Sequence, residues 1–138
     1  MKKKDDWQPR LFAFIEKNYT KPFAWGTWDC CKFSNAAIKE MTGNDLIPKE
    51  LKWKDEASAI KSIKEYGGTI GKSIDKAAKS KKLMPVKRPF LQCGDLVIYK
   101  EDSELVGIYD GQAILSPSED GIEVKPTDLA IRGWRING

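Results

Sequence analysis

The chain contains no histidine among its 138 residues. Histidine is the usual general base beside a catalytic serine or cysteine, and it is also the commonest metal ligand. Its absence excludes a Cys–His or Ser–His–Asp catalytic unit formed by this chain alone. The three cysteines lack the paired spacing of a four-ligand zinc site, and no phosphate-binding or dinucleotide-binding glycine motif occurs. We therefore expect neither a metal nor a cofactor.

Long hydrophobic runs are also missing from the sequence. The segment Met1–Asp6 is charged and is not followed by the apolar stretch of a signal peptide, and no later segment approaches the length of a membrane span. An odd number of cysteines, two of them adjacent, is not the pattern of a secreted disulfide framework. We expect one domain over residues 1–138 that folds in a reducing cytosol.

The net charge is modest, at +4, but its distribution is uneven. Seven basic residues lie between Lys72 and Arg88, with one acid, Asp75, among them. Such a segment is suited to nucleic acid or an anionic polymer. Because no aromatic residues alternate with the lysines to stack on bases, a solvated helix face and loop is the favoured interpretation.

Helical periodicity dominates the first half of the chain. Apolar residues at spacings of three and four predict helices over residues 6–18, 30–41, 55–66 and about 69–82. Gly43 is expected to end the second helix, and Gly67 and Gly68 the third. Pro85 and Pro89 then close a helical part that covers about residues 6–84.

Short apolar runs separated by turn residues follow from Gly94 onward. They predict strands over residues 95–99, 105–109, 112–115, 122–124 and 133–136. Connections this short suit antiparallel neighbours. A helical part followed by a β-meander over about residues 94–136 predicts an α+β fold, with N-terminal helices packed on a C-terminal antiparallel sheet.

A cysteine is expected at the start of the second helix. Asp29 is the predicted N-cap and places Cys30 in the first turn, where the helix dipole and free backbone N–H groups favour a thiolate. The alternative is a buried cysteine that acts as a small hydrophobe, since the periodicity puts Cys30 on the inward face. Cys31 is expected on the side of Ser34 and Asn35.

Aromatic residues surround these cysteines in the sequence. The groove candidates for a sugar or peptide ligand are Trp25, Trp28, Trp53 and Asp29. Aromatic residues near a helix start also commonly anchor the core, so both interpretations stay open for the tryptophans.

Three motifs occur in a fixed order: W-G-x-x-D-C opening a helix, C-G-D-L-V-I-Y at a strand start, and L-V-G-I-Y-D-G at a strand and turn. Together, over Phe23 to about Val124, they resemble the NlpC-type cell-wall peptidases, which are small cysteine peptidases of the papain-like fold. The chain also resembles short phage and prophage proteins that pair a P-F-A-W-G-x-x-D-C turn with a closing W-R-I. Here these are Pro22–Cys30 and Trp134–Ile136.

In these peptidases the helix-start cysteine is the nucleophile, a histidine opening the H-V-G-I-Y strand is the base, and a polar residue on the next strand orients that histidine. The resemblance places the nucleophile at Cys30 and the base at Leu105. The third position falls near Leu115 or Ser116, and we take Ser116. Leucine can neither activate a thiol nor protonate a leaving amine. Glu104, adjacent to Leu105 on the strand, is expected to face away from Cys30.

The resemblance therefore implies a peptidase fold without the peptidase reaction, in a structural protein of a phage or prophage tail tip or hub. Such a protein is made in the host cytoplasm and assembled into the virion, and its expected partners are other tail proteins and peptidoglycan. Two alternatives stay open. One is an active hydrolase of cell-wall peptides that uses Cys30 and a base from the substrate, water or a partner chain. The other is a module that binds nucleic acid or an anionic polymer through residues 72–88.

Overall fold

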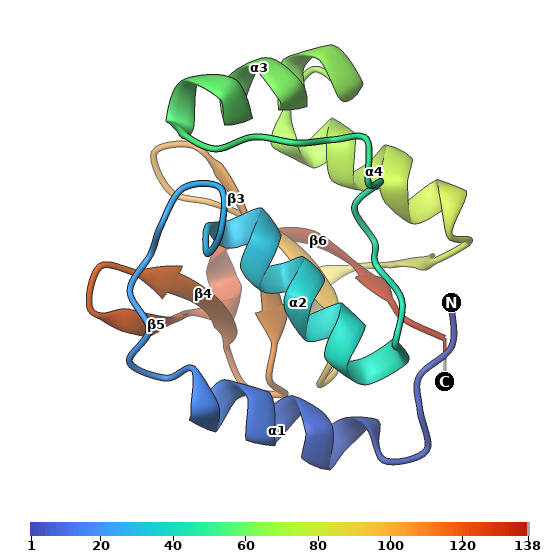
Figure 1. Cartoon of the computed structure of the whole chain (residues 1–138). Coiled ribbons are helices and arrows are strands. Elements are labelled where there is room, and N and C mark those ends of the chain that lie inside the picture. Colours follow the sequence, from blue (N-terminus) through green and yellow to red (C-terminus); the bar gives the residue numbers. More distant parts are fainter. Residues whose placement is uncertain (138) are drawn as a thin grey trace.

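The computed structural model describes residues 1–137, and within them the helices precede most of the sheet (Figure 1). The helices are α1 (Trp7–Lys17), α2 (Cys30–Thr42), α3 (Glu56–Tyr66) and α4 (Ile70–Ser80). The strands are β1 (Met84–Val86), β2 (Leu96–Lys100), β3 (Glu104–Tyr109), β4 (Ile114–Ser118), β5 (Gly121–Lys125) and β6 (Ala130–Arg135). Two short 3-10 turns, Arg88–Phe90 and Thr127–Leu129, connect strands.

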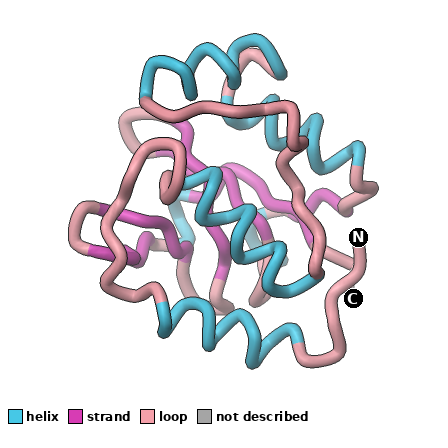
Figure 2. Tube along the Cα trace, in the orientation of Figure 1, coloured by secondary structure: helices cyan, strands magenta, loops and turns pink. Residues whose placement is uncertain are grey.

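The strands form one antiparallel sheet in the order β1-β6-β2-β3-β4-β5. Helix α2 crosses one face of this sheet, α1 lies along one end, and α3 and α4 lie at the opposite end (Figures 1 and 2). The expected α+β fold, with helices packed on an antiparallel sheet, is confirmed. Among the described residues no helix has the length and apolar character needed to cross a membrane.

The helix boundaries follow the expected capping residues. Asp29 caps α2 by accepting from the backbone N of Lys32 at 2.8 Å. Gly43 ends α2 in the left-handed region, at φ +81°, where glycine is favoured. Asp55 forms a reciprocal capping box with Ser58 at the start of α3. The predicted helices therefore agree closely with the observed ones.

Three strand predictions need correction. Pro85 was expected only to terminate the helical half, but it lies in β1, a strand at the edge of the sheet, where a missing backbone N–H is tolerated. Strand β4 begins at Ile114 and continues through Pro117, later than the expected 112–115. Strand β6 begins at Ala130, before the expected residue 133.

The two faces of the sheet bury different clusters. On one face, α2 packs against β3 and β4, and this core includes Phe33, Ile38, Ile98, Val106 and Ile108. On the other face the buried residues are Val97, Tyr99, Tyr109, Ile114 and Ala130. Side chains along β2 and β3 point alternately to these two buried faces. Both strands are therefore continuous apolar runs in the sequence.

Two of the sequence motifs meet in a buried ion pair. Asp95 of C-G-D accepts hydrogen bonds from Arg135 of W-R-I, at 3.0 Å from Nε and 2.8 Å from Nη2. The backbone N of Gln92 also donates to Asp95, which is completely buried, and Arg135 donates further to the Phe90 carbonyl. The hydrogen bond to Asp95 raises the pKa of Arg135. These motif residues therefore hold β6 against the start of β2.

Candidate functional site

Asp29 fixes the turn that precedes α2. One carboxylate oxygen, Oδ1, accepts from the backbone of Lys32, while Oδ2 accepts from the backbone N of Gly26 at 2.9 Å and from Trp53 Nε1 at 2.7 Å. Both oxygens of this buried side chain are therefore engaged. The carboxylate joins the aromatic turn, the helix start and the segment that leads to α3.

Gly26 allows that turn to pack closely on the segment before α3. Its φ is +84°, and a Cβ added there would lie only 2.8 Å from the Cα of Lys54. Both the left-handed backbone and the contact favour glycine at this position. The turn consequently brings Trp25 to the same groove as the first residues of α3.

A groove of about 500 Å³ opens beside the start of α2. Its walls come from the aromatic turn, the starts of α2 and β3, helix α3 and the start of α4. The lining residues important for chemistry are Trp25, Cys30, Cys31, Glu56, Glu104 and Leu105. A groove of this size and largely apolar character is typical of ligand sites.

The two adjacent thiols are both buried and interact with each other. The Cys31 thiol and the backbone of Val106 lower the pKa of Cys30, against burial and the nearby Asp29 carboxylate, which act to raise it. The pKa of Cys31 is raised by its interaction with the Cys30 thiol and by burial. The contact between the two thiols therefore acts on their pKa values in opposite directions.

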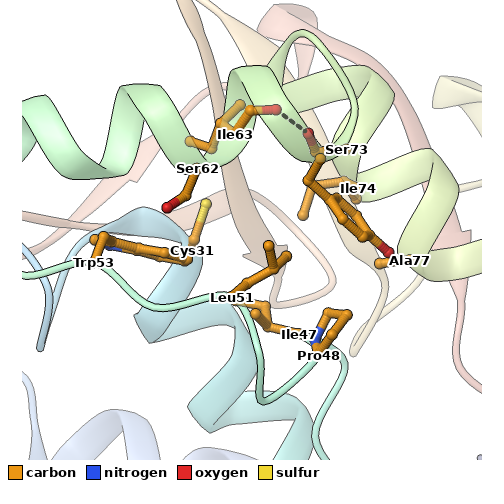
Figure 3. A pocket seen from close by; sticks show the side chains of 11 residues that line it. Cys31, Ile47, Pro48, Leu51, Trp53, Ser62, Ile63, Ser73, Ile74 and Ala77 are labelled. Atoms are coloured by element: carbon orange, nitrogen blue, oxygen red, sulfur yellow. Dashed lines mark hydrogen bonds between the residues drawn. The ribbon is translucent and has the colours of Figure 1, made fainter.

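Cys31 is buried, and so is Ser34, with which it was expected to share a side of α2. It lines a small apolar cavity of about 30 Å³ between α2, α3, α4 and the segment from Ile47 to Trp53 (Figure 3). That segment covers this side of α2, which is why the helix is buried over more of its surface than its periodicity indicates. The cavity has room for about one or two water molecules and is too small for a ligand.

The predicted base position faces the groove with an apolar side chain. Leu105 is half-buried, packs against both core clusters and lines the groove together with Cys30. Its neighbour Glu104 accepts from the backbone N of Gly71 at 3.3 Å, at the start of α4. The Glu104 carboxylate is therefore directed to the start of α4, but it lines the groove together with Cys30 and Leu105, so its facing away from Cys30 stays a prediction.

The predicted third position, Ser116, is buried on β4 and is not among the groove-lining residues. Its hydroxyl donates to the Val106 carbonyl at 3.4 Å, and the Tyr99 phenol on β2 lies near it. Tyr99 pairs with Leu105 across the β2–β3 ladder and lies close enough to Cys30 to interact with its charge. Tyr99 does not itself line the groove, and sequence reasoning did not single it out, because an aromatic residue in an apolar strand gives no functional signal.

Burial of Tyr99 makes a testable contribution to the pH dependence of stability. Its side chain is 1% exposed, and burial raises the pKa of Tyr99 well above the ordinary value of 10.0. Above pH 10 the phenol ionises in the unfolded chain but stays protonated in the folded one, so stability falls as pH rises. We expect this group to cost about 1.4 kcal/mol per pH unit above pH 10.

Denaturant unfolding of the wild type and Tyr99→Phe across this pH range measures that effect. The stability of the wild type relative to the variant should fall from pH 10 upward. Cys31 and the lysines also titrate in this pH range, but they are present in both proteins, so their contributions to stability cancel in the comparison. An unchanged difference between the two proteins would contradict the assignment of a protonated, buried phenol.

Of the three candidate groove tryptophans, Trp53 lines the groove, and the other two occupy different environments. Trp25 is 41% exposed, packs edge-to-face on Phe23 with centroids 5.0 Å apart, and lines the groove. Trp28 is 4% exposed and packs between Phe14 and Phe33 in the core. Trp25 therefore keeps its place as a groove residue, whereas the structure places Trp28 among the core anchors.

The basic segment lies on α4 and the chain that follows it. Lys79 pairs with Asp75 at 2.9 Å, Lys76 donates to the Tyr66 carbonyl, and Arg88 donates to the Asp128 carbonyl. These three cations are already engaged within the chain. Binding of nucleic acid or an anionic polymer by residues 72–88 stays a prediction.

Metal binding finds no support in the side-chain arrangement. Within residues 1–137, no three histidine, cysteine or acidic residues come together in a way that would hold a metal ion. The third cysteine, Cys93, lies apart from the pair, near Gln8.

Comparison with known proteins places this geometry in a family. A solved structure, the NlpC/p60 domain of peptidoglycan hydrolase SagA, is similar in fold, with a TM-score of 0.59 and 15% identity over 94% of this chain and 98% of that chain. No curated protein sequence matches the chain. A family model described as Domain of unknown function (DUF6950) matches residues 2–136. The chain therefore belongs to the DUF6950 family, and its fold is that of an NlpC/p60 domain.

Proposed function

We propose that the protein is a non-catalytic member of the NlpC/p60-like fold, in which the nucleophile position is kept and the base position is lost. The observation that carries this proposal is Leu105, which lines the groove with Cys30 where the resemblance places the base. The sequence holds no histidine that another element can supply. The nearby carboxylates of Asp29 and Glu104 are engaged in binding backbone N–H groups and Trp53.

The energetic argument favours an inactive groove. Loss of a general base typically costs a factor of about 10² to 10⁴ in rate, and a triad member can cost more. The dipole of α2 supplies only about 0.3 to 1 kcal/mol toward ionising Cys30. Even if the Cys30 thiol ionises, the reaction also needs an acid to protonate the leaving amine, and Leu105 cannot supply one. We conclude that the groove is suited to binding and not to turnover.

The proposed setting is the tail tip or hub of a phage or prophage particle, with synthesis in the host cytoplasm. Support comes from the P-F-A-W-G-x-x-D-C turn and the W-R-I ending, through which the sequence resembles short phage and prophage proteins. Tail particles purified from an induced lysogen that carries an epitope-tagged copy of this chain test the setting. The tag should co-sediment with tails and with their other proteins. A tag found only among free proteins would contradict it.

An active cysteine hydrolase is the second candidate. Cys30 at the start of α2, with a pKa below its ordinary value, is the observation in its favour. An electrophilic cell-wall peptide probe distinguishes the two candidates, because an active enzyme forms a covalent adduct on Cys30. We expect the same negligible labelling of the wild type and Cys30→Ala. Rapid labelling that depends on Cys30 would favour the hydrolase.

A further inference from the structure

The groove beside Cys30 differs in charge from the molecule as a whole. Its walls carry the carboxylates of Asp29, Glu56 and Glu104 and one cation, Lys64, whereas the chain has a net charge of +4. Glu56 is exposed and Glu104 is half-buried, so both affect the potential in the groove. The groove therefore attracts positive charge on a protein that otherwise repels it.

An exposed aromatic ring lies in the same groove. Trp25 is 41% exposed, and among the described residues no lysine or arginine lies over its ring. Trp53, the other tryptophan of the groove, is already covered by Lys32 Nζ at 4.5 Å from its ring centroid and donates to Asp29. A cation placed over a tryptophan face is attracted by the ring electrons. Trp25 is therefore the ring available to a cation from outside the chain.

Apolar surface continues from this acidic and aromatic part of the groove. Ile60 on α3 is 58% exposed, and Leu105 and Ile70 complete the apolar walls. The volume of about 500 Å³ accommodates several side chains of a bound segment. A ligand that fits this groove therefore needs two features, a positive charge near Trp25 and an apolar group near Ile60.

We propose that the groove binds a peptide segment of a partner protein in which a lysine or arginine is followed by apolar side chains. The cation lies against Trp25 and Glu56, and the apolar side chain packs on Ile60 and Leu105. Charge complementarity selects this occupant, because an acidic segment is repelled by the groove carboxylates. The proposal rests on the proposed function in one respect, since a groove without a base holds the segment intact.

Fluorescence anisotropy with two labelled peptides tests the proposal on the full chain at low salt. One peptide alternates leucine with lysine, and the other alternates leucine with glutamate. We expect the lysine peptide to bind at least tenfold more tightly, although the net charge of the protein favours the glutamate peptide. Trp25→Ala should weaken its binding about tenfold, and Glu56→Gln about threefold.

Two control variants lie outside the groove. Phe90→Ala removes a side chain that is 68% exposed, and Glu119→Gln removes an exposed carboxylate, so both should bind as the wild type does. Equal affinity for the two peptides, equal weakening by the controls, or no binding at millimolar peptide would overturn the proposal. If Trp25→Ala fails to fold, the Glu56→Gln variant, which changes an exposed side chain, still tests whether the groove carboxylates contribute to binding of the lysine peptide.

Mass spectrometry of the peptide after incubation separates this proposal from the proposed function. Tight binding with an intact peptide supports both. Tight binding followed by cleavage that Cys30→Ala abolishes supports the groove assignment and contradicts the non-catalytic function. An intact peptide without binding overturns the groove assignment alone.

Discussion

Arg135→Ala is expected to lower the free energy of unfolding by about 3 to 5 kcal/mol, because it leaves a buried carboxylate without its partner. Asp95 is completely buried and receives two hydrogen bonds from the Arg135 guanidinium. A single backbone N–H, from Gln92, would remain to it. Denaturant unfolding monitored by tryptophan fluorescence measures the change, and Trp134, next to Arg135, is itself buried.

A matched control comes from the same strand. The Arg132 side chain is 44% exposed, approaches Asp75 only at 4.0 Å and lies over the Trp134 ring at 5.1 Å from its centroid. Arg132→Ala should therefore cost less than about 1 kcal/mol. The double variant Asp95→Asn, Arg135→Met should recover part of the loss, because it removes both charges. Similar small effects of Arg132→Ala and Arg135→Ala would contradict the structural role of the C-G-D and W-R-I motifs.

Leu105→His is expected to raise the alkylation rate of Cys30 at pH 7 by about tenfold or more. A free thiol is only a few per cent ionised at that pH, and a neighbouring imidazolium lowers the pKa of a cysteine. Leu105 lines the groove with Cys30 at the position where the resemblance places the histidine that activates the cysteine. Iodoacetamide labelling in a Cys93→Ser background, with the site assigned by peptide fragmentation, leaves the Cys30–Cys31 contact intact.

Ile60→His is the control for this substitution. Ile60 lines the same groove from α3 and is 58% exposed, so a histidine there adds an imidazole to the groove without occupying the base position. We expect it to leave the alkylation rate close to that of the wild type. Equal acceleration by both variants, or none by Leu105→His, would refute the assignment of Leu105 to the base position.

Much of the fold follows from local patterns in the sequence. Capping residues act on the adjacent backbone, so they predict where a helix begins or ends. The observed helices begin or end beside Asp29, Gly43 and Asp55. The apolar runs of β2 and β3 were predictable for a similar reason. Order along the chain, with helices before strands, was then enough to predict an α+β fold.

Features that depend on distant parts of the chain could not be predicted in this way. The burial of Cys31 depends on the segment from Ile47 to Trp53, which has no helical or strand pattern. The pairing of Asp95 with Arg135 joins residues forty positions apart. Local periodicity carries no information about such contacts. The sequence therefore predicts a helix cap, a strand or a polar residue, but it does not predict which distant residue each of them contacts.

The candidate site shows the same division. The helix-start position of Cys30 and the placement of Leu105 in the groove were reached from motifs. The contact of Tyr99 with Ser116 was not, because β2 and β4 are brought together only by the sheet. The use of both Asp29 oxygens was also hidden, since Trp53 lies twenty-four residues away in the sequence.

Incubation of the purified protein with peptidoglycan, followed by mass spectrometry of the released fragments, tests the central claim most directly. The NlpC/p60 domain of the peptidoglycan hydrolase SagA serves as the positive control. We predict that this chain releases no more fragments than its Cys30→Ala variant, because Leu105 provides no base. Release of peptide fragments by the wild type, lost in Cys30→Ala, would contradict the claim and establish an enzyme that activates its cysteine without histidine.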